Sequence, residues 1–207
     1  MRKLIVGTFL TLDGVMQAPG GPGEDDSGGF AHGGWSVNYW DERMAEVMGA
    51  SMSVPFDLVL GRRTYDIFAA HWPKAPEEAG GKPLNDATKY VASRGRPALD
   101  WGPSVLLGDA AEGVAALREE DGPELQVHGS GDLILTLMRH GLVDEYRLWV
   151  FPVVLGSGKR LFADGAIPGA LKLVDSTVST TGVVIGTYEP AGELVTGFVR
   201  AGVSAAV

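Results

Sequence analysis

Short apolar runs alternate with amphipathic segments along most of the chain. The runs are too short for helices and are bounded by Gly, Pro or Asp, as buried strands of a parallel sheet are. They comprise Lys3 to Leu12, Asp57 to Leu60, Lys89 to Ala92, Ser104 to Leu107 and Glu124 to His128. Because helical patterns lie between them, the sequence predicts an α/β fold in which helices cover both faces of a mostly parallel sheet.

Three amphipathic segments predict helices that pack on this sheet. The first runs from about Tyr39 to Met52 and carries an apolar stripe at helical spacing. The second starts at Asp109 with a capping-box pattern and stops at Gly122, and the third begins after Gly131 and ends at Gly141. The apolar stripes consist of Trp40, Met44, Val47 and Met48, then Val114 and Leu117, then Leu133, Ile134, Leu137 and Met138.

After Val143 the pattern changes to longer strands, which are predicted at Glu145 to Leu155, Leu171 to Ser179 and Val183 to Glu189. A turn around Thr181-Gly182 joins the last two strands, so the sequence predicts a mixed sheet that ends in an antiparallel hairpin. One domain over residues 1–190 accounts for the whole pattern, and residues 191–207 form a C-terminal extension. The stretch from Gln17 to Gly34 is rich in Gly and Pro and is predicted to be a long loop with no core of its own.

Composition and charge exclude several classes of function. The chain has 17 Lys and Arg against 26 Asp and Glu, a net charge of -9, so it lacks a wide basic face for nucleic acid or an anionic membrane. It has no cysteine, which excludes disulfides, thiolate catalysis and cysteine-ligated zinc and favours the cytoplasm. No apolar run approaches the roughly 18 residues of a membrane span. The four histidines lack metal-ligand spacing, and no metal is predicted.

Two strand-to-helix turns, Leu60 to Thr64 and Val127 to Asp132, carry the candidate chemistry. Both place small residues and free backbone amides at a helix N-terminus beyond a strand's carboxyl end, where open α/β folds bind phosphates. Neither turn matches the dinucleotide fingerprint G-x-G-x-x-G. Two alternatives stay open: Arg62 and Arg63 are solvated surface charges, and the glycines of the second turn only permit tight packing.

Three motifs resemble, in order, the dihydrofolate-reductase-like superfamily: Phe9 to Gly14, Leu60 to Tyr65, and the turn Gly129-Ser130-Gly131. The segment from Gly141 to Phe162 narrows the resemblance to the C-terminal reductase domain of the bifunctional riboflavin-biosynthesis deaminase/reductase and its stand-alone bacterial relatives. The similarity extends from Lys3 to about Glu189 and implies the three-layer fold of that superfamily. Without cysteines, the chain contains no zinc deaminase domain.

The resemblance implies a reductase that uses NADPH and acts on a pterin-like or aminouracil-like substrate. Dihydrofolate reductase itself and an NADPH-binding protein without turnover are the alternatives. The family also implies a homodimer, and the apolar strand from Tyr146 to Leu155, expected near a sheet edge, would need covering. The implied cofactor-binding residues are Gly61, Arg62, Arg63, Thr64, Ser93, Arg94, Gly129, Ser130, Gly131, Asp132 and Gly156.

The substrate end of the site follows from the same resemblance. Asp13 would lie beside the nicotinamide and is the implied catalytic residue, while Asp41 or Glu42 corresponds to the carboxylate that grips a pterin ring. The alternative for these two helix acids is that they only complement the helix dipole. The aromatic candidates for stacking on a planar heterocycle are Trp35 and Tyr39, with Phe30 and Trp40 nearby. Equally, Trp40 belongs to the core and the others to a lid.

Overall fold

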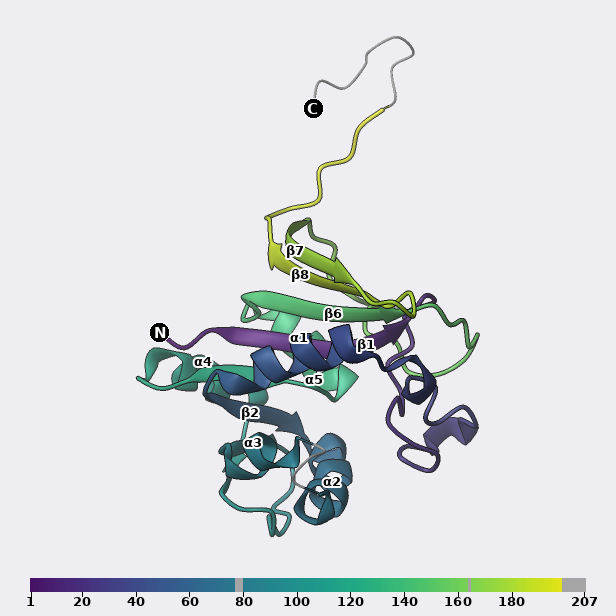
Figure 1. Cartoon of the computed structure of the whole chain (residues 1–207). Coiled ribbons are helices and arrows are strands. Elements are labelled where there is room, and N and C mark those ends of the chain that lie inside the picture. The colour runs from purple at the N-terminus through teal and green to yellow at the C-terminus, as the bar shows by residue number, and fades with distance from the viewer. Residues whose placement is uncertain (77–79, 164, 199–207) are drawn as a thin grey trace.

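The computed structural model describes residues 1–76, 80–163 and 165–198, which form an α/β fold around one eight-stranded sheet (Figure 1). The strand order is β4-β3-β2-β5-β1-β6-β8-β7. The strands from β4 to β6 are parallel, whereas β8 is antiparallel to β6 and β7 is antiparallel to β8. The predicted mostly parallel sheet with a C-terminal antiparallel hairpin is confirmed. Of the predicted C-terminal extension, residues 199–207 lie outside the described part of the chain.

The strands agree with the apolar runs within two residues, apart from the strand predicted at Glu145 to Leu155. That strand ends at Phe151, because Pro152 has no N–H to donate to the sheet. It also lies between β1 and β8, so its predicted place near an edge is wrong, and the edge strands are β4 and β7. The strands are β1 (Leu4–Thr11), β2 (Phe56–Gly61), β3 (Lys89–Ala92), β4 (Ser104–Leu107), β5 (Glu124–Val127), β6 (Glu145–Phe151), β7 (Leu171–Val178) and β8 (Val184–Pro190).

The helices are α1 (Glu42–Ser53), α2 (Arg62–His71), α3 (Gly81–Asp86), α4 (Ala110–Glu119) and α5 (Gly131–Arg139). Short 3-10 turns occur at Ser27–Gly29, Val37–Tyr39 and Trp72–Lys74. The predicted start of the first helix at Tyr39 is wrong by three residues. Tyr39 closes a 3-10 turn, and the helix begins after Asp41, whose carboxylate accepts a hydrogen bond from the Met44 amide at 2.8 Å.

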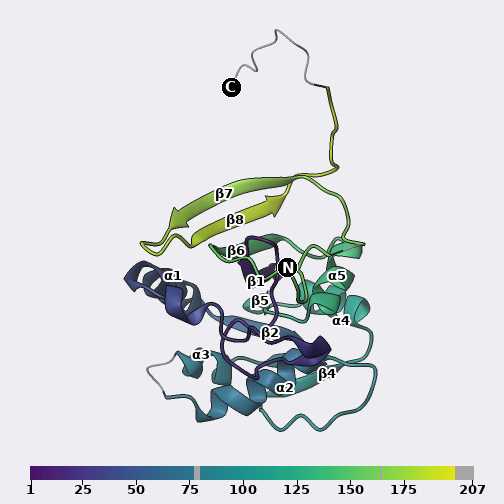
Figure 2. The same ribbon diagram turned by 90° about the vertical axis from the view of Figure 1, so that its right-hand side faces the viewer.

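Helices cover both faces of the sheet, as the sequence predicts. Figure 2 shows α1 on one side of the central strands and α4 and α5 on the other. The α4 and α5 stripes are buried against β1 and β5, with Ile134 and Leu137 at the centre of that core. On the opposite face Met44 of α1 is buried against Trp149 and Phe151 of β6. Both helix layers therefore fix where the carboxyl ends of the strands lie.

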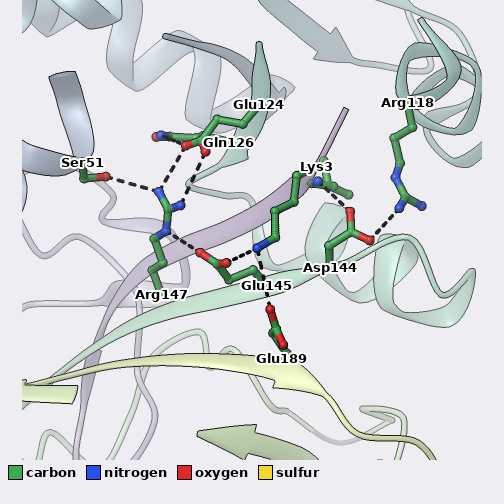
Figure 3. Close-up of polar contacts among 10 residues, drawn as sticks. Lys3, Ser51, Arg118, Glu124, Gln126, Asp144, Glu145, Arg147 and Glu189 are labelled. Atoms are coloured by element: carbon green, nitrogen blue, oxygen red, sulfur yellow. Dashed lines mark hydrogen bonds and ion pairs between the residues drawn. The ribbon is translucent and has the colours of Figure 1, made fainter. Parts of the chain in front are cut away.

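Ion pairs link side chains at the amino ends of the strands (Figure 3). The guanidinium group of Arg147 contacts Glu145 at 2.6 Å and Glu124 at 3.1 Å, and Lys3 pairs with Glu145. Arg118 pairs with Asp144 at 2.6 Å. Arg118 belongs to α4, and the other charges sit on β5, β6 and the segments just before β1 and β6, so these pairs join neighbouring strands and one helix. This edge of the sheet is held by the chain's own side chains.

Candidate functional site

The carboxyl ends of β2 and β5 lie side by side in the middle of the sheet. At this division the chain leaves the two strands toward opposite faces of the sheet. These two strands are neighbours, but α2 packs on one face of the sheet and α5 packs on the other. The Gly61 amide at the end of β2 donates to the Gly129 carbonyl after β5 at 3.1 Å. A ligand in an open α/β sheet binds in the crevice at such a division, outside the carboxyl ends of the strands. The two turns singled out in the sequence therefore come together.

The glycines of these turns fall into two groups. A Cβ on Gly61 would lie 2.4 Å from the Ser130 hydroxyl, and one on Gly129 would lie 2.8 Å from the Thr64 hydroxyl, so both are required for packing. A Cβ on Gly131 would meet its nearest neighbour, the Met16 sulfur, at 3.6 Å, which is an ordinary contact. Packing thus explains Gly61 and Gly129 and leaves Gly131 without a packing requirement.

The helices that begin at the two turns have open N-termini. Within the described part of the chain, neither α2 nor α5 has a side-chain hydrogen bond at its N-cap, whereas Asp41 caps α1 and Asp109 caps α4. An uncapped N-terminus presents backbone N–H groups and the positive end of the helix dipole. Two such ends beside one crevice fit the phosphates of a dinucleotide.

Four cations lie on or near these turns and the neighbouring loops, and carboxylates contact three of them. Arg62 contacts Asp66 at 2.7 Å within α2. Arg63 contacts Asp25 at 2.5 Å, and Lys159, in the loop after β6, contacts the other oxygen of Asp25 at 2.7 Å. Arg94 is exposed beyond β3, after Ser93, whose hydroxyl accepts from the Gly95 amide at 3.2 Å. Arg62 and Arg63 are therefore ion-paired as well as near solvent, which the sequence did not predict.

Asp13 lies at the end of β1 and binds the loop after β6. Its carboxylate accepts hydrogen bonds from the Thr11 hydroxyl at 2.6 Å and from the Gly156 amide at 2.8 Å, and it contacts Arg160 at 3.3 Å. The Thr11 hydrogen bond, followed by the Leu155 and Gly156 amides, holds the pKa of Asp13 well below its usual range. The group stays ionised at neutral pH, so it can orient a polar or cationic partner but not donate a proton.

The predicted substrate-binding residues lie on the β6 side of the site. The Trp35 and Tyr39 rings pack edge-on against Phe151, with centroids 5.3 and 5.9 Å away, and both rings are partly buried. Besides capping α1, Asp41 accepts two hydrogen bonds from Thr180 in the hairpin turn, at 2.6 and 2.7 Å. Its carboxylate thus serves the helix and the hairpin, as the first-turn alternative implies, and its contact with a substrate stays a prediction.

The loop from Gln17 to Gly34 has a small core, contrary to the prediction from sequence. Ala18 and Phe30 are buried together with Val15, and Trp35 and Leu155 pack beside them. The Trp35 indole N–H donates to the Gln17 carbonyl at 2.8 Å. The loop is therefore a packed flap beside the crevice, because its few apolar side chains find partners that follow β1 and β6.

Four residues of the site were not predicted from the sequence, namely Thr11, Asp25, Lys159 and Arg160. Asp25 stands in the acidic run Glu24-Asp25-Asp26, but only Asp25 points inward, and nothing local distinguishes it from its neighbours. Lys159 and Arg160 follow the Gly156-Ser157-Gly158 turn, whose return toward β1 depends on long-range pairing such as the bridge between Val15 and Arg160. The only local signal was the position of these residues beside a predicted site loop.

His128 directly follows β5, next to the Gly129 turn, and behaves as a structural residue. Its Nε2 lies 3.1 Å from the Gln126 amide oxygen, and burial lowers its pKa to about 4. Among the described residues, no three histidine, cysteine, aspartate or glutamate side chains lie together in a way that could hold a metal ion. No helix of the described chain is long and apolar enough to cross a membrane.

Comparisons with known proteins found a matching family and two bacterial relatives. The RibD C-terminal domain family matches residues 2–185. The uncharacterized protein YyaP of Bacillus subtilis (strain 168) is 30% identical over 187 residues, covering 88% of this chain and 92% of its own. YwjB of the same organism is 26% identical, covering 78% and 83%.

Solved structures share the fold at low sequence identity. A putative riboflavin biosynthesis protein from Shewanella sp. PV-4 superposes with a TM-score of 0.64 at 21% identity, over 91% of this chain and 98% of the other. A pyrimidine reductase-like protein from Corynebacterium diphtheriae gives 0.59 at 12% identity over 93% of both chains. Dihydrofolate reductase from Enterococcus faecalis, complexed with NADP(H), gives 0.57 at 14% identity over 91% and 96%. The predicted dihydrofolate-reductase-like fold is thereby confirmed.

Proposed function

Because the chain belongs to the RibD C-terminal domain family, we propose that it is an NADPH-dependent oxidoreductase of the riboflavin-biosynthesis type. Its substrate would be a planar pterin-like or aminouracil-like ring, such as a ribosylated aminouracil. The observation that carries the proposal is the pair of uncapped helix N-termini at the Gly61 and Gly129 turns, which a hydrogen bond holds side by side. Such a site favours a ligand with two or more phosphate groups.

The chain offers separate groups for each part of the cofactor. The amides of the Gly129 to Asp132 turn and of the Gly61 to Thr64 turn would hold the pyrophosphate. Arg62 and Arg63, with Arg94 and Ser93 beyond β3, would contact the 2′-phosphate, because guanidinium donates paired hydrogen bonds to phosphate oxygens. Gly131 would allow the close approach of the phosphate, since its position needs no glycine for packing.

Asp13 would position the substrate end of the site. Held by Thr11 and Gly156, its ionised carboxylate orders the loop after β6 and leaves a fixed negative charge beside the crevice. NADPH would supply a hydride to a C=N or C=O carbon of the ring, leaving NADP⁺, and a solvent proton would complete the reduction. Trp35, Tyr39 and Asp41 would border the ring from the β6 side.

Steady-state oxidation of NADPH tests the proposal. The purified chain is assayed with the ribosylated aminouracil substrate and, in parallel, with dihydrofolate, while NADPH binding is titrated by fluorescence. Oxidation with the aminouracil supports the proposal, and faster oxidation with dihydrofolate makes the protein a dihydrofolate reductase. Binding without oxidation of either makes it a dinucleotide-binding protein, and the absence of binding contradicts a cofactor site.

We also propose that the protein is a cytoplasmic homodimer. Support comes from the edge strand β7, on which Leu171, Leu173, Val174 and Val178 are exposed in this single chain. An uncovered apolar edge strand favours association with a second copy. Light scattering at micromolar concentration is expected to give twice the chain mass of 21.8 kDa, and a monomeric mass would contradict the dimer.

A further inference from the structure

The carboxylate of Asp25 joins two cations that belong to different elements of the structure. Its Oδ1 lies 2.5 Å from the Arg63 guanidinium in the first turn of α2, and its Oδ2 lies 2.7 Å from the Lys159 ammonium in the loop after β6. Asp25 itself is buried at 8% exposure, although both cations are about half exposed. One buried anion thus occupies the space toward which two accessible cations converge.

The flap holds this carboxylate in place from behind. The Ser27 amide and hydroxyl donate to Oδ1 at 3.1 and 2.6 Å. The Gln17 side-chain amide donates to the carbonyls of Asp25 and Ser27, both at 2.9 Å, and its oxygen accepts from the Lys159 amide at 3.0 Å. Burial would raise the pKa of Asp25, but the Lys159 and Ser27 hydrogen bonds lower it to about 2, so the group is ionised.

The chemistry of these donors suits a phosphate oxygen as well as a carboxylate. Arg63 offers further N–H donors, and Lys159 offers three in all, so both could bind a phosphate. A phosphate next to the Asp25 carboxylate would, however, meet a like charge only a few ångströms away, which disfavours simultaneous binding. The carboxylate and a ligand phosphate therefore exclude each other to the extent that they need the same cations.

We infer that Asp25 is an internal anion that competes with a cofactor phosphate for Arg63 and Lys159 and thereby sets the affinity of the crevice for dinucleotides. This inference rests on the proposed function, since it assigns the competing phosphate to NADPH. Binding of that phosphate displaces the Asp25 side chain and loosens the flap from Gln17 to Gly34. Asp25 thus weakens the binding of the cofactor and makes flap opening part of it.

The test measures dissociation constants for NADPH and NADH at one fixed salt concentration. Asp25→Asn removes the charge with almost no change of shape and is expected to tighten NADPH about tenfold, the equivalent of one competing charge-assisted hydrogen bond. Ser27→Ala is the matched control, because it loosens the same flap without altering charge, and it should tighten binding far less than Asp25→Asn. In Asp25→Asn/Arg63→Ala, the gain should disappear.

Inorganic pyrophosphate gives a readout that does not depend on the nicotinamide. At constant ionic strength it should raise the melting temperature of Asp25→Asn by more than that of the wild type. Asp25→Ser, a smaller neutral replacement, serves the same comparison if Asp25→Asn does not fold. Tightening for NADPH alone assigns the competition to the 2′-phosphate, and tightening for NADH as well assigns it to the pyrophosphate; both support the inference.

Unchanged or weaker NADPH binding by folded Asp25→Asn would overturn the inference, because Asp25 would then only organise the two cations. Tightening by Ser27→Ala as large as that by Asp25→Asn would also overturn it, since loosening of the flap alone would then explain the gain. If no variant binds either dinucleotide, the proposed function fails, yet the pyrophosphate comparison still decides whether Asp25 competes with phosphate.

Discussion

The two ends of the parallel strands satisfy their charges in opposite ways. At the amino ends, Arg2 and Asp57 form an ion pair in which the side chains are only 3% and 13% exposed. At the carboxyl ends, Arg63 and Lys159 are 54% and 48% exposed although both contact Asp25. The charges at the amino ends are therefore buried against each other. Those at the carboxyl ends keep hydrogen-bond donors accessible to solvent.

The backbone shows the same contrast. Beyond the carboxyl ends of β2 and β5, helix N-termini lack side-chain caps, and Gly61 and Gly129 bring the two turns into contact. An uncapped helix end gives up stabilisation that a capping side chain normally provides, about 1 kcal/mol. Of the described α-helices, α1 and α4 are capped by a side chain, whereas α2, α5 and the six-residue α3 are not; the ends of α2 and α5 lie together, and their amides are available. The residues at the amino ends therefore stabilise the fold, whereas those at the carboxyl ends are the ones proposed to bind a ligand.

The largest expected effect is the loss of a buried ion pair at the amino edge. Arg2→Met leaves the Asp57 carboxylate without its cation and removes the hydrogen bond to the Pro123 carbonyl, so it should lower the free energy of unfolding by about 3–5 kcal/mol. Urea denaturation measures this loss. Arg43→Met, which breaks the exposed Arg43–Glu46 pair, is the control and should change stability by under about 0.5 kcal/mol. Equal effects of the two would contradict the contrast between buried and exposed charges.

Two glycines of the carboxyl edge should respond differently to valine. Gly61→Val places a side chain against Ser130 and should lower the free energy of unfolding by about 3 kcal/mol. Gly131→Val should change stability by less than about 1 kcal/mol, because its Cβ meets only ordinary contacts, yet it should weaken NADPH binding by obstructing the phosphate. Denaturation and fluorescence titration of both variants check this. A Gly131→Val protein that unfolds easily but binds NADPH normally when folded would make Gly131 a packing residue.

Acid should act on the carboxyl edge before the amino edge. The pKa of His128 is about 4 in the folded protein against 6.5 in the unfolded chain, so the unfolded chain binds more protons as the pH falls through this window. Stability is fully present above pH 6.5 and should fall by about 2 kcal/mol between about pH 7 and pH 5. His128→Gln should flatten this dependence in urea denaturation. Glu145, whose pKa is lowered below 4.5 because Lys3 and Arg147 outweigh burial, matters only at lower pH. An unchanged pH dependence in His128→Gln would assign the acid sensitivity to another group.

The last expected effects concern cofactor preference and change binding rather than stability. Arg62→Ala or Arg63→Ala should weaken NADPH binding roughly ten- to a hundredfold and hardly change NADH binding, because only NADPH carries the 2′-phosphate. Arg94→Ala should have a smaller effect, since Arg94 lies in an exposed segment beyond β3. Arg139→Ala, at the far end of α5, is the control. Equal losses for both cofactors would place these arginines at the shared pyrophosphate.

Local signals in the sequence predicted most of the fold. Strand boundaries followed from apolar runs between Gly, Pro and Asp, and the cap of α4 followed from the Asp109 to Glu112 pattern, where Asp109 accepts from two amides at 2.9 Å. The interior position of β6 could not be predicted, because it depends on pairing with β1 and β8 across long sequence separations. The helix from Gly81 to Asp86 was missed, since six residues give too short a pattern.

In the candidate site, too, the local features were predictable from the sequence and the long-range contacts were not. The turns at Gly61 and Gly129 were recognisable because a strand, small residues and a helix follow one another in sequence. The partners of Arg63 and Asp13 were not, because Asp25 and Arg160 reach them only after the flap and the loop after β6 have folded back. Side-chain direction within an acidic run such as Glu24 to Asp26 depends on tertiary packing, which periodicity does not describe.

Hydrogen–deuterium exchange with and without NADPH tests the central claim, that the carboxyl edge binds the dinucleotide. NADPH should protect the amides of residues 60–66 and 128–134, where α2 and α5 begin. Peptides from the amino edge, residues 1–4 and 118–125, should exchange as in the free protein. Protection confined to the amino edge, or no protection of either turn under conditions that saturate binding, would contradict the account.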